Sequence, residues 1–120
     1  QMIKIKLFEI LDAKEPIIKL MNCELPVKTA YKLSKMAVKL QAELNVIEDN
    51  RKKIYELLGE KTNEGISIPK DKVPEFQLKM NELLQVEVEL DIELIKLSEI
   101  ESAKITPMQL TAITKLLEEK

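Results

Sequence analysis

The chain has 120 residues, of which 45% are hydrophobic and 33% charged, and it contains two glycines, one cysteine and no histidine. The absence of histidine removes the commonest general base and the commonest metal ligand, and two glycines are too few for a phosphate-binding loop. One cysteine excludes an intrachain disulfide framework. The formal net charge of −2 argues against a generally basic nucleic-acid-binding protein. We therefore expect one domain that is not an enzyme and has neither a cofactor nor a metal site.

The segments that would direct a chain to a membrane are not evident in the sequence. No run approaches the roughly 18 apolar residues that span a bilayer. Near the beginning of the chain, Lys4, Lys6, Glu9 and Asp12 interrupt the apolar stretch that a signal peptide needs. We therefore expect no membrane partner and a cytoplasmic location.

The first elements are short. Residues 2–7 alternate between apolar side chains and lysines, which predicts a strand with Lys4 and Lys6 on its outer face. Residues 8–23 contain Pro16, and because proline is tolerated in the first turn of a helix, we expect a short helix to begin there.

The strongest periodic signal runs over residues 26–58. Apolar side chains recur there at alternating steps of three and four, and only Arg51 interrupts them. Pro26 suits the first helical position and Gly59 lies just past the last one. This predicts a helix of about 50 Å that lies against another helix and whose seam leaves the core at Arg51. The seam consists of Ala30, Leu33, Ala37, Leu40, Leu44, Ile47, Arg51, Ile54 and Leu58.

A shorter helix follows a loop. Residues 61–73 are rich in turn formers and charges and predict a loop, in which residues 66–68 form at most a brief edge strand. Residues 74–85 have apolar side chains at helical spacing, and this second helix makes an unequal antiparallel hairpin with the long one.

Residues 86–94 alternate without error between apolar and acidic side chains, which predicts a half-buried strand. We expect this strand to pair with residues 2–7, so that lysines face carboxylates with about 0.2–1 kcal/mol per opposed pair. The outer face carries Glu87, Glu89, Asp91 and Glu93. It is either a solvated face or a site for a divalent cation or a basic partner.

The end of the chain predicts one more helix. Thr106 is a good N-cap and Pro107 a good first residue for a C-terminal helix over residues 107–119. Together the elements predict a mainly helical α+β domain over residues 1–120. It combines a long antiparallel helical hairpin with a small two- to three-stranded sheet and the C-terminal helix.

Residues 5–14 and 95–104 are identical at seven of ten positions. A unit of strand, turn and helix that is used twice would produce this similarity, and so would chance in a chain rich in Ile, Leu, Lys and Glu.

A basic stripe is the more informative surface signal. Its lysines follow the spacing i, i+4, i+7, i+11, and no acidic residue lies between Glu24 and Glu43. We expect the stripe on the helix face opposite the seam, where it is either a solvated face or a surface for an acidic protein or a phosphate backbone. The stripe consists of Lys28, Lys32, Lys35 and Lys39.

Several segments resemble a known family. The segments are a strand like residues 3–7, the start of a long helix at Leu25-Pro26-Val27-Lys28-Thr29-Ala30-Tyr31, residues 75–84, Glu87-Val88-Glu89-Leu90 and Ile105-Thr106-Pro107. In this order they resemble small proteins encoded by phages of Gram-positive bacteria. The function of that family is unknown, and the resemblance implies an origin in an infected bacterial cell but no catalytic or binding residues.

The sequence favours a non-enzymatic interaction protein that presents its helical hairpin to a host, defence or phage protein. Two alternatives remain, namely nucleic-acid binding through the lysine stripe and homo-oligomeric assembly through the long helix. The residues expected to contact a partner are Lys28, Lys32, Lys35, Lys39, Arg51, Lys52 and Tyr55.

Overall fold

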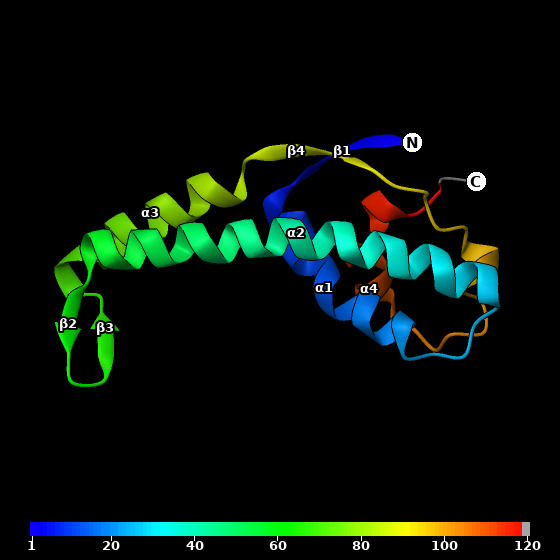
Figure 1. Cartoon of the computed structure of the whole chain (residues 1–120), viewed down its shortest axis with the longest axis horizontal. Helices are drawn as coiled ribbons and strands as arrows, with labels where there is room; N and C mark the ends of the chain where they lie inside the picture. The colour runs from blue at the N-terminus through cyan, green and yellow to red at the C-terminus, as the bar shows by residue number, and fades with distance from the viewer. Residues whose placement is uncertain (119–120) are drawn as a thin grey trace.

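One long helix sets the length of the molecule. A computed structural model describes residues 1–118, and its longest dimension, 49 Å, follows helix α2 (Val27–Leu58), as Figure 1 shows. The helix predicted over residues 26–58 is present but begins one residue later, because Pro26 is its N-cap and not its first residue. Gly59 donates its N–H to the carbonyl oxygen of Tyr55 at 2.7 Å and ends the helix.

Helix α1 (Leu7–Met21) packs against the N-terminal half of α2. It begins directly after the first strand, because the carboxylate of Glu9 accepts a hydrogen bond from the N–H of Lys6 at 3.0 Å. The expectation that a helix begins at Pro16 is wrong, since Pro16 is buried in the interior of α1. A proline there costs about 3 kcal/mol or more, and the buried apolar face of α1 offsets this cost. That face consists of Leu7, Ile10, Ala13, Ile17 and Leu20.

Helix α3 (Val73–Leu84) runs back along the C-terminal half of α2, so the predicted antiparallel hairpin is confirmed (Figure 1). None of its residues is buried, although several are large and apolar. We call residues 44–84, which comprise this half of α2, α3 and their connection, the arm. The remaining described residues are called the body.

The connection inside the arm is more ordered than the predicted loop over residues 61–73. Strands β2 (Glu60–Thr62) and β3 (Gly65–Ser67) form an antiparallel hairpin, and a single 3-10 turn (Lys70–Lys72) leads into α3. The backbone of Gly65 has φ of +120°, a conformation that glycine adopts without strain. The brief strand expected at residues 66–68 therefore exists, one residue earlier, as part of this hairpin.

The predicted pairing of the first and fourth strands is confirmed. Strands β1 (Met2–Lys6) and β4 (Glu87–Asp91) are antiparallel, with Lys4 opposite Glu89 and Lys6 opposite Glu87. The strand predicted over residues 86–94 is shorter than expected, because β1 has no residue opposite its last positions. Instead of ion pairs between the opposed groups, the ammonium of Lys6 donates to the side-chain oxygen of Gln85 at 3.0 Å.

The C-terminal helix ends earlier than predicted. Helix α4 (Pro107–Ala112) is followed by a 3-10 turn (Thr114–Leu116), so the expected helix over residues 107–119 is wrong beyond Ala112, and residue 119 lies outside the described residues. The chain leaves the helix because Ile95 bonds to the backbone on either side of Leu117. Its N–H donates to the carbonyl of Leu116, and its carbonyl accepts from Glu118, both at 2.8 Å.

The two similar segments share only their first turn. Glu99 accepts a hydrogen bond from the N–H of Lys96 at 2.9 Å, as Glu9 does from Lys6. Beyond this turn, residues 7–14 continue as a helix, whereas residues 97–99 form one 3-10 turn. The two segments therefore share a four-residue cap but are not a repeated structural unit.

Elements from both ends of the chain meet in one hydrophobic core. The seam of α2 is shifted slightly from the prediction, since Thr29 and Met36 are buried and Ala30 is exposed. Of the helices described, none combines the length and the apolar character that crossing a membrane requires. The largest fully buried side chains are Ile5, Ile10, Leu20, Leu33, Met36, Ile95, Ile113 and Leu116.

Truncating the core in α1 is expected to destabilise the whole domain. Ile10 is 0% exposed, so Ile10→Ala should lower the free energy of unfolding by about 2–5 kcal/mol, through lost burial and the cavity left behind. Leu78 on α3 is 59% exposed, and Leu78→Ala should change the free energy of unfolding by less than about 0.5 kcal/mol. Urea unfolding measures both, and equal effects would contradict this assignment of the core.

Candidate functional site

The four predicted lysines of α2 do not form one solvated stripe. Lys28, Lys35 and Lys39 are exposed, but the side chain of Lys32 is only 15% exposed. Its ammonium nitrogen lies 2.8 Å from the nearer carboxylate oxygen of Glu99. The prediction of a lysine face opposite the seam is therefore wrong for Lys32, which is held inside the body by its carboxylate partner.

Lys32 and Glu99 are the centre of a small polar cluster. The ammonium of Lys32 also donates to the carbonyl oxygen of Leu94 at 3.2 Å, and the hydroxyl of Thr29 lies 3.5 Å from the second oxygen of Glu99. Two hydrogen bonds to the carboxylate hold the pKa of Glu99 below its ordinary value. The larger contribution comes from the ammonium of Lys32 and the smaller one from the N–H of Lys96. The cluster fastens the segment after β4 to the first turns of α2.

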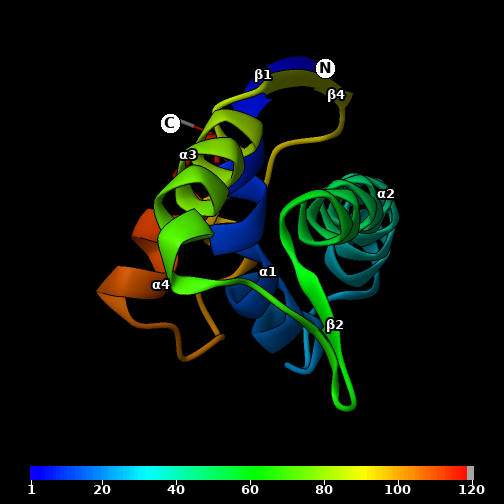
Figure 2. The same ribbon diagram turned by 90° about the vertical axis from the view of Figure 1, so that its left-hand side faces the viewer.

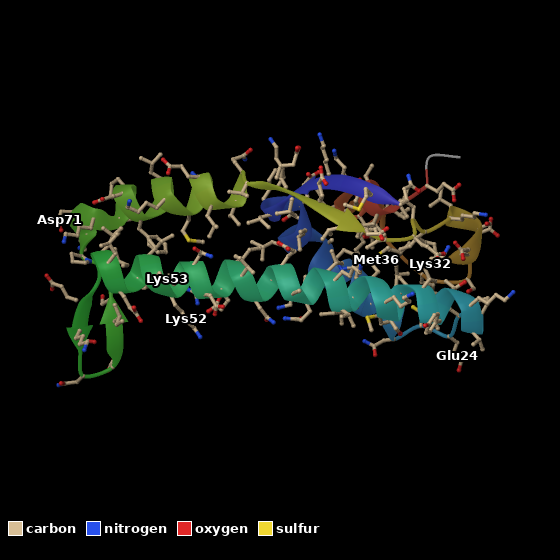
Figure 3. The ribbon with its side chains drawn as sticks, turned by 45° about the horizontal axis from the view of Figure 1, so that its top comes forward. Glu24, Lys32, Met36, Lys52, Lys53 and Asp71 are labelled. Atoms are coloured by element: carbon tan, nitrogen blue, oxygen red, sulfur yellow. The ribbon has the colours of Figure 1, made fainter. Side chains whose placement is uncertain are left out.

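The remaining lysines of the stripe border a pocket that also contains carboxylates. The pocket, of about 280 Å³, lies between α2 and the chain around the end of β4, with Met36 on its apolar side (Figure 3). The ammonium nitrogen of Lys32 lies 3.9 Å from a carboxylate oxygen of Glu93 across this pocket. Because both signs of charge line this pocket, it is not a purely basic surface. The charged lining side chains are Lys32, Lys35, Lys39, Asp91 and Glu93.

The predicted acidic face is divided by the end of the strand. Glu87, Glu89 and Asp91 are exposed on β4, whereas Glu93 follows the strand and faces Lys32. Within residues 1–118 there is no group of three His, Cys, Asp or Glu side chains with the proximity that a metal ion requires.

The other predicted contact residues come together in the arm. The guanidinium of Arg51 donates two hydrogen bonds to the carboxylate of Glu48, at 2.8 and 3.0 Å, and lies over the ring of Tyr55, 5.2 Å from its centre. The ring of Tyr55 packs edge-on against Phe76 of α3, with 4.8 Å between ring centres. These contacts fix the orientation of Arg51 and Tyr55.

Arg51 does not end the packing of α2, as the sequence led us to expect. Its side chain is half-buried, and Leu58, seven residues further on, is 5% exposed. The seam continues because the charge is paired with Glu48 at the flank of the helix, while α3 covers the positions beyond it.

Arg51 and Tyr55 border an open pocket between α2 and the β2–β3 hairpin. Ile66 of β3 closes one side of it, and this isoleucine is 38% exposed. The hairpin approaches α2 closely because Gly59 has no side chain, and a Cβ atom there would lie against Ile66 and 2.5 Å from the carbonyl oxygen of Tyr55. We call this the arm pocket. Its lining residues are Arg51, Lys52, Tyr55, Glu56 and Ile66.

The lone cysteine is accounted for by local structure. Cys23 is half-buried, and its thiol donates to the carbonyl oxygen of Lys19 at 3.3 Å. Across the described part of the chain, no histidine and no second cysteine is present to activate it.

Sequence reasoning missed Glu99, Ile66 and Phe76. It also missed Glu48 and Glu56, which adjoin Arg51 in the arm. Glu99 is far from Lys32 in the sequence, but the spacing of Lys96 and Glu99, which repeats that of Lys6 and Glu9, marks it as a cap residue. No local signal connects Ile66 or Phe76 with Tyr55, since their contacts depend on how the chain turns at the end of the arm.

Comparisons of the chain with models of protein families, with curated proteins and with solved structures find no match in any of the three. The resemblance to phage proteins therefore stays a prediction.

Removing the carboxylate of Glu99 should change stability in a pH-dependent way. Because folding holds its pKa below the ordinary value of 4.5, the unfolded chain takes up the proton first, and the ion pair stabilises the fold above about pH 4.5. Glu99→Gln should lower the free energy of unfolding at neutral pH by about 1–3 kcal/mol, and this difference from the wild type should shrink as the pH falls below 4.5.

Urea unfolding of wild type and variant across this pH range measures the effect. Glu101→Gln is the matched control, because Glu101 is exposed in the same segment and forms no ion pair among the described residues. A constant difference between Glu99→Gln and the wild type at all pH values would contradict the assigned role of the carboxylate.

Proposed function

We propose that this chain is a non-enzymatic protein, encoded by a phage, that binds a protein partner through the arm. The observation that carries the proposal is the arm pocket, where Arg51 and Tyr55 are held beside the exposed side chain of Ile66. Arginine and tyrosine are among the residue types in which the binding energy of protein interfaces is concentrated.

The arm pocket suits binding because its polar groups are already ordered. The two hydrogen bonds from Arg51 to Glu48 and the contact of Tyr55 with Phe76 restrict both side chains before a partner arrives. A partner therefore loses less affinity to the ordering of these side chains. Lys52 is exposed at the rim and is free of ion pairs within the described residues, so it supplies a charge that a partner can reach.

The alternatives have less support from the geometry. Tracking a phosphate backbone requires several unpaired lysines, but Lys32 is paired with Glu99, and Lys35 and Lys39 share their pocket with Asp91. Assembly through the seam of α2 requires that seam to be open, but α1 covers one half of it and α3 the other.

Substitutions in the arm pocket should abolish partner capture without unfolding the protein. In an affinity capture from nuclease-treated lysate of a bacterial host, washed at high salt, the wild type should retain a stoichiometric protein. Lys52→Glu combined with Tyr55→Ala should reduce the retained amount at least roughly tenfold, because the double variant removes the central tyrosine and reverses the charge at the rim. Mass spectrometry and gel densitometry provide the readout.

Tyr31→Ala is the matched control, because Tyr31 is an exposed tyrosine near the opposite end of α2 with a lysine over its ring, as Tyr55 has an arginine. It should leave capture unchanged. Equal loss in both variants, or retention of the same protein by the Lys52→Glu/Tyr55→Ala variant, would refute the proposal.

A further inference from the structure

The strand β1 has an edge whose backbone groups face outwards. In the β1–β4 pair, Ile92 donates its N–H to the carbonyl of Gln1, and Leu7 donates to the carbonyl of Val86, both at 3.0 Å. The backbone N–H and carbonyl groups of the odd-numbered residues of β1 therefore point toward β4. In an antiparallel ladder the backbone groups of the intervening residues point to the opposite side, away from β4. The intervening residues are Met2 and Lys4, followed by Lys6.

This edge is open over two residues. Within residues 1–118, Met2 and Lys4 make no backbone hydrogen bond outside the β1–β4 pair, and the sheet contains only these two strands. Their backbone groups, which point away from β4, are therefore unpaired. The edge ends at Lys6, whose N–H is bonded to Glu9. Figures 2 and 3 show β4 on the side of β1 that is nearer to α2, so the open edge of β1 is on the side away from that helix.

The side chains along this edge alternate in a way that selects a partner. Ile5 is buried beneath the strand, whereas Lys4 is exposed on the outer face and lies opposite Glu89 without forming an ion pair within 4.0 Å. On its inner side, β1 already pairs with a strand of alternating apolar and acidic residues. The outer edge offers the same charges to a second strand of that kind.

We propose that the open edge of β1 binds an extended segment of a protein partner that carries aspartate or glutamate at every second position. The backbone groups of Met2 and Lys4 pair with the incoming segment, as in the addition of a strand to a sheet edge. The ammonium group of Lys4 faces its carboxylates and gives the interaction its charge selectivity.

A second folded copy of this chain does not fit the same edge. Pairing β1 with β1 of another copy would oppose lysines, which is unfavourable. Pairing it with β4 of another copy would require the outer edge of that strand, because its inner side already pairs with β1, and the end of that outer edge is next to α2. An extended segment without a domain beneath it avoids both conflicts.

The edge of β4 is less suited to a partner than that of β1. Its end is next to α2, where Lys35 and Lys39 share a pocket with Asp91. The open edge of β1 is in the body, whereas the arm pocket is near the far end of α2, so the two proposals fail or succeed separately (Figure 1).

The experiment uses a capped peptide with the sequence of residues 86–92, Val-Glu-Val-Glu-Leu-Asp-Ile, added to the isotope-labelled full chain. Up to about 1 mM peptide, the backbone amide signals of Met2 and Lys4 should shift in a saturable way and become protected from hydrogen exchange. A peptide with lysine in place of its three acidic residues should cause no such shift.

Two variants at one position separate backbone pairing from charge. Lys4→Pro removes the ammonium and an N–H that points away from β4, and it should weaken binding roughly fivefold or more. Lys4→Ala removes the ammonium but keeps the N–H and should weaken binding less. If Lys4→Pro does not fold, Met2→Pro removes the neighbouring outward N–H instead.

The proposal is overturned if no amide shifts, if Lys4→Pro binds as well as Lys4→Ala, or if the shifts appear at Ile3 and Ile5. The last result would mean that the peptide replaces β4 instead of adding to the edge.

Discussion

The fold depends on covering one long apolar seam. A single helix of 32 residues gains little stability from its own hydrogen bonds in water, so α2 persists because other helices bury its apolar side. No other helix of the described chain is long enough to cover the whole seam. Two helices from different parts of the sequence cover the seam together. Helix α1 packs on its first half and α3 on its second half.

This division explains why the two halves of the molecule differ. The body surrounds the seam with α1, the β1–β4 sheet and the C-terminal turns, and it contains nearly all of the fully buried side chains. The arm has only α3 and a small hairpin, and none of the residues of α3 is buried. Exposed large apolar side chains occur in both parts, among them Val27, Tyr31 and Met108 in the body and Leu57 and Leu78 in the arm. Three of the four ion pairs of the described residues are in the body.

The sequence predicts the elements whose signals are local. The heptad seam of α2, the alternation in β1 and β4 and the cap at Thr106 all appear in the structure, because each depends on neighbours within a few residues. The failures are non-local. Pro16 lies inside a helix because burial of a whole face outweighs one proline, and α4 stops early because Ile95 pairs with the chain beyond it. Of the candidate site, Arg51 and Tyr55 were identified, but their neighbours Phe76 and Ile66 come from segments that only the tertiary fold brings close.

The lysines show why composition and spacing do not decide which charges are available to a partner. Lys32 and Lys39 are seven residues apart on α2 and would be equivalent on an isolated helix. In the folded chain Lys32 is paired with Glu99 and Lys39 is exposed. Lys4, in contrast, lies opposite a carboxylate and still makes no ion pair, because a regular antiparallel ladder holds the two backbones in register without requiring their charged ends to meet. An ammonium group contributes to recognition only where the fold leaves it without a close carboxylate. Lys4 on β1 and Lys52 at the rim of the arm pocket are among the lysines that make no ion pair within residues 1–118.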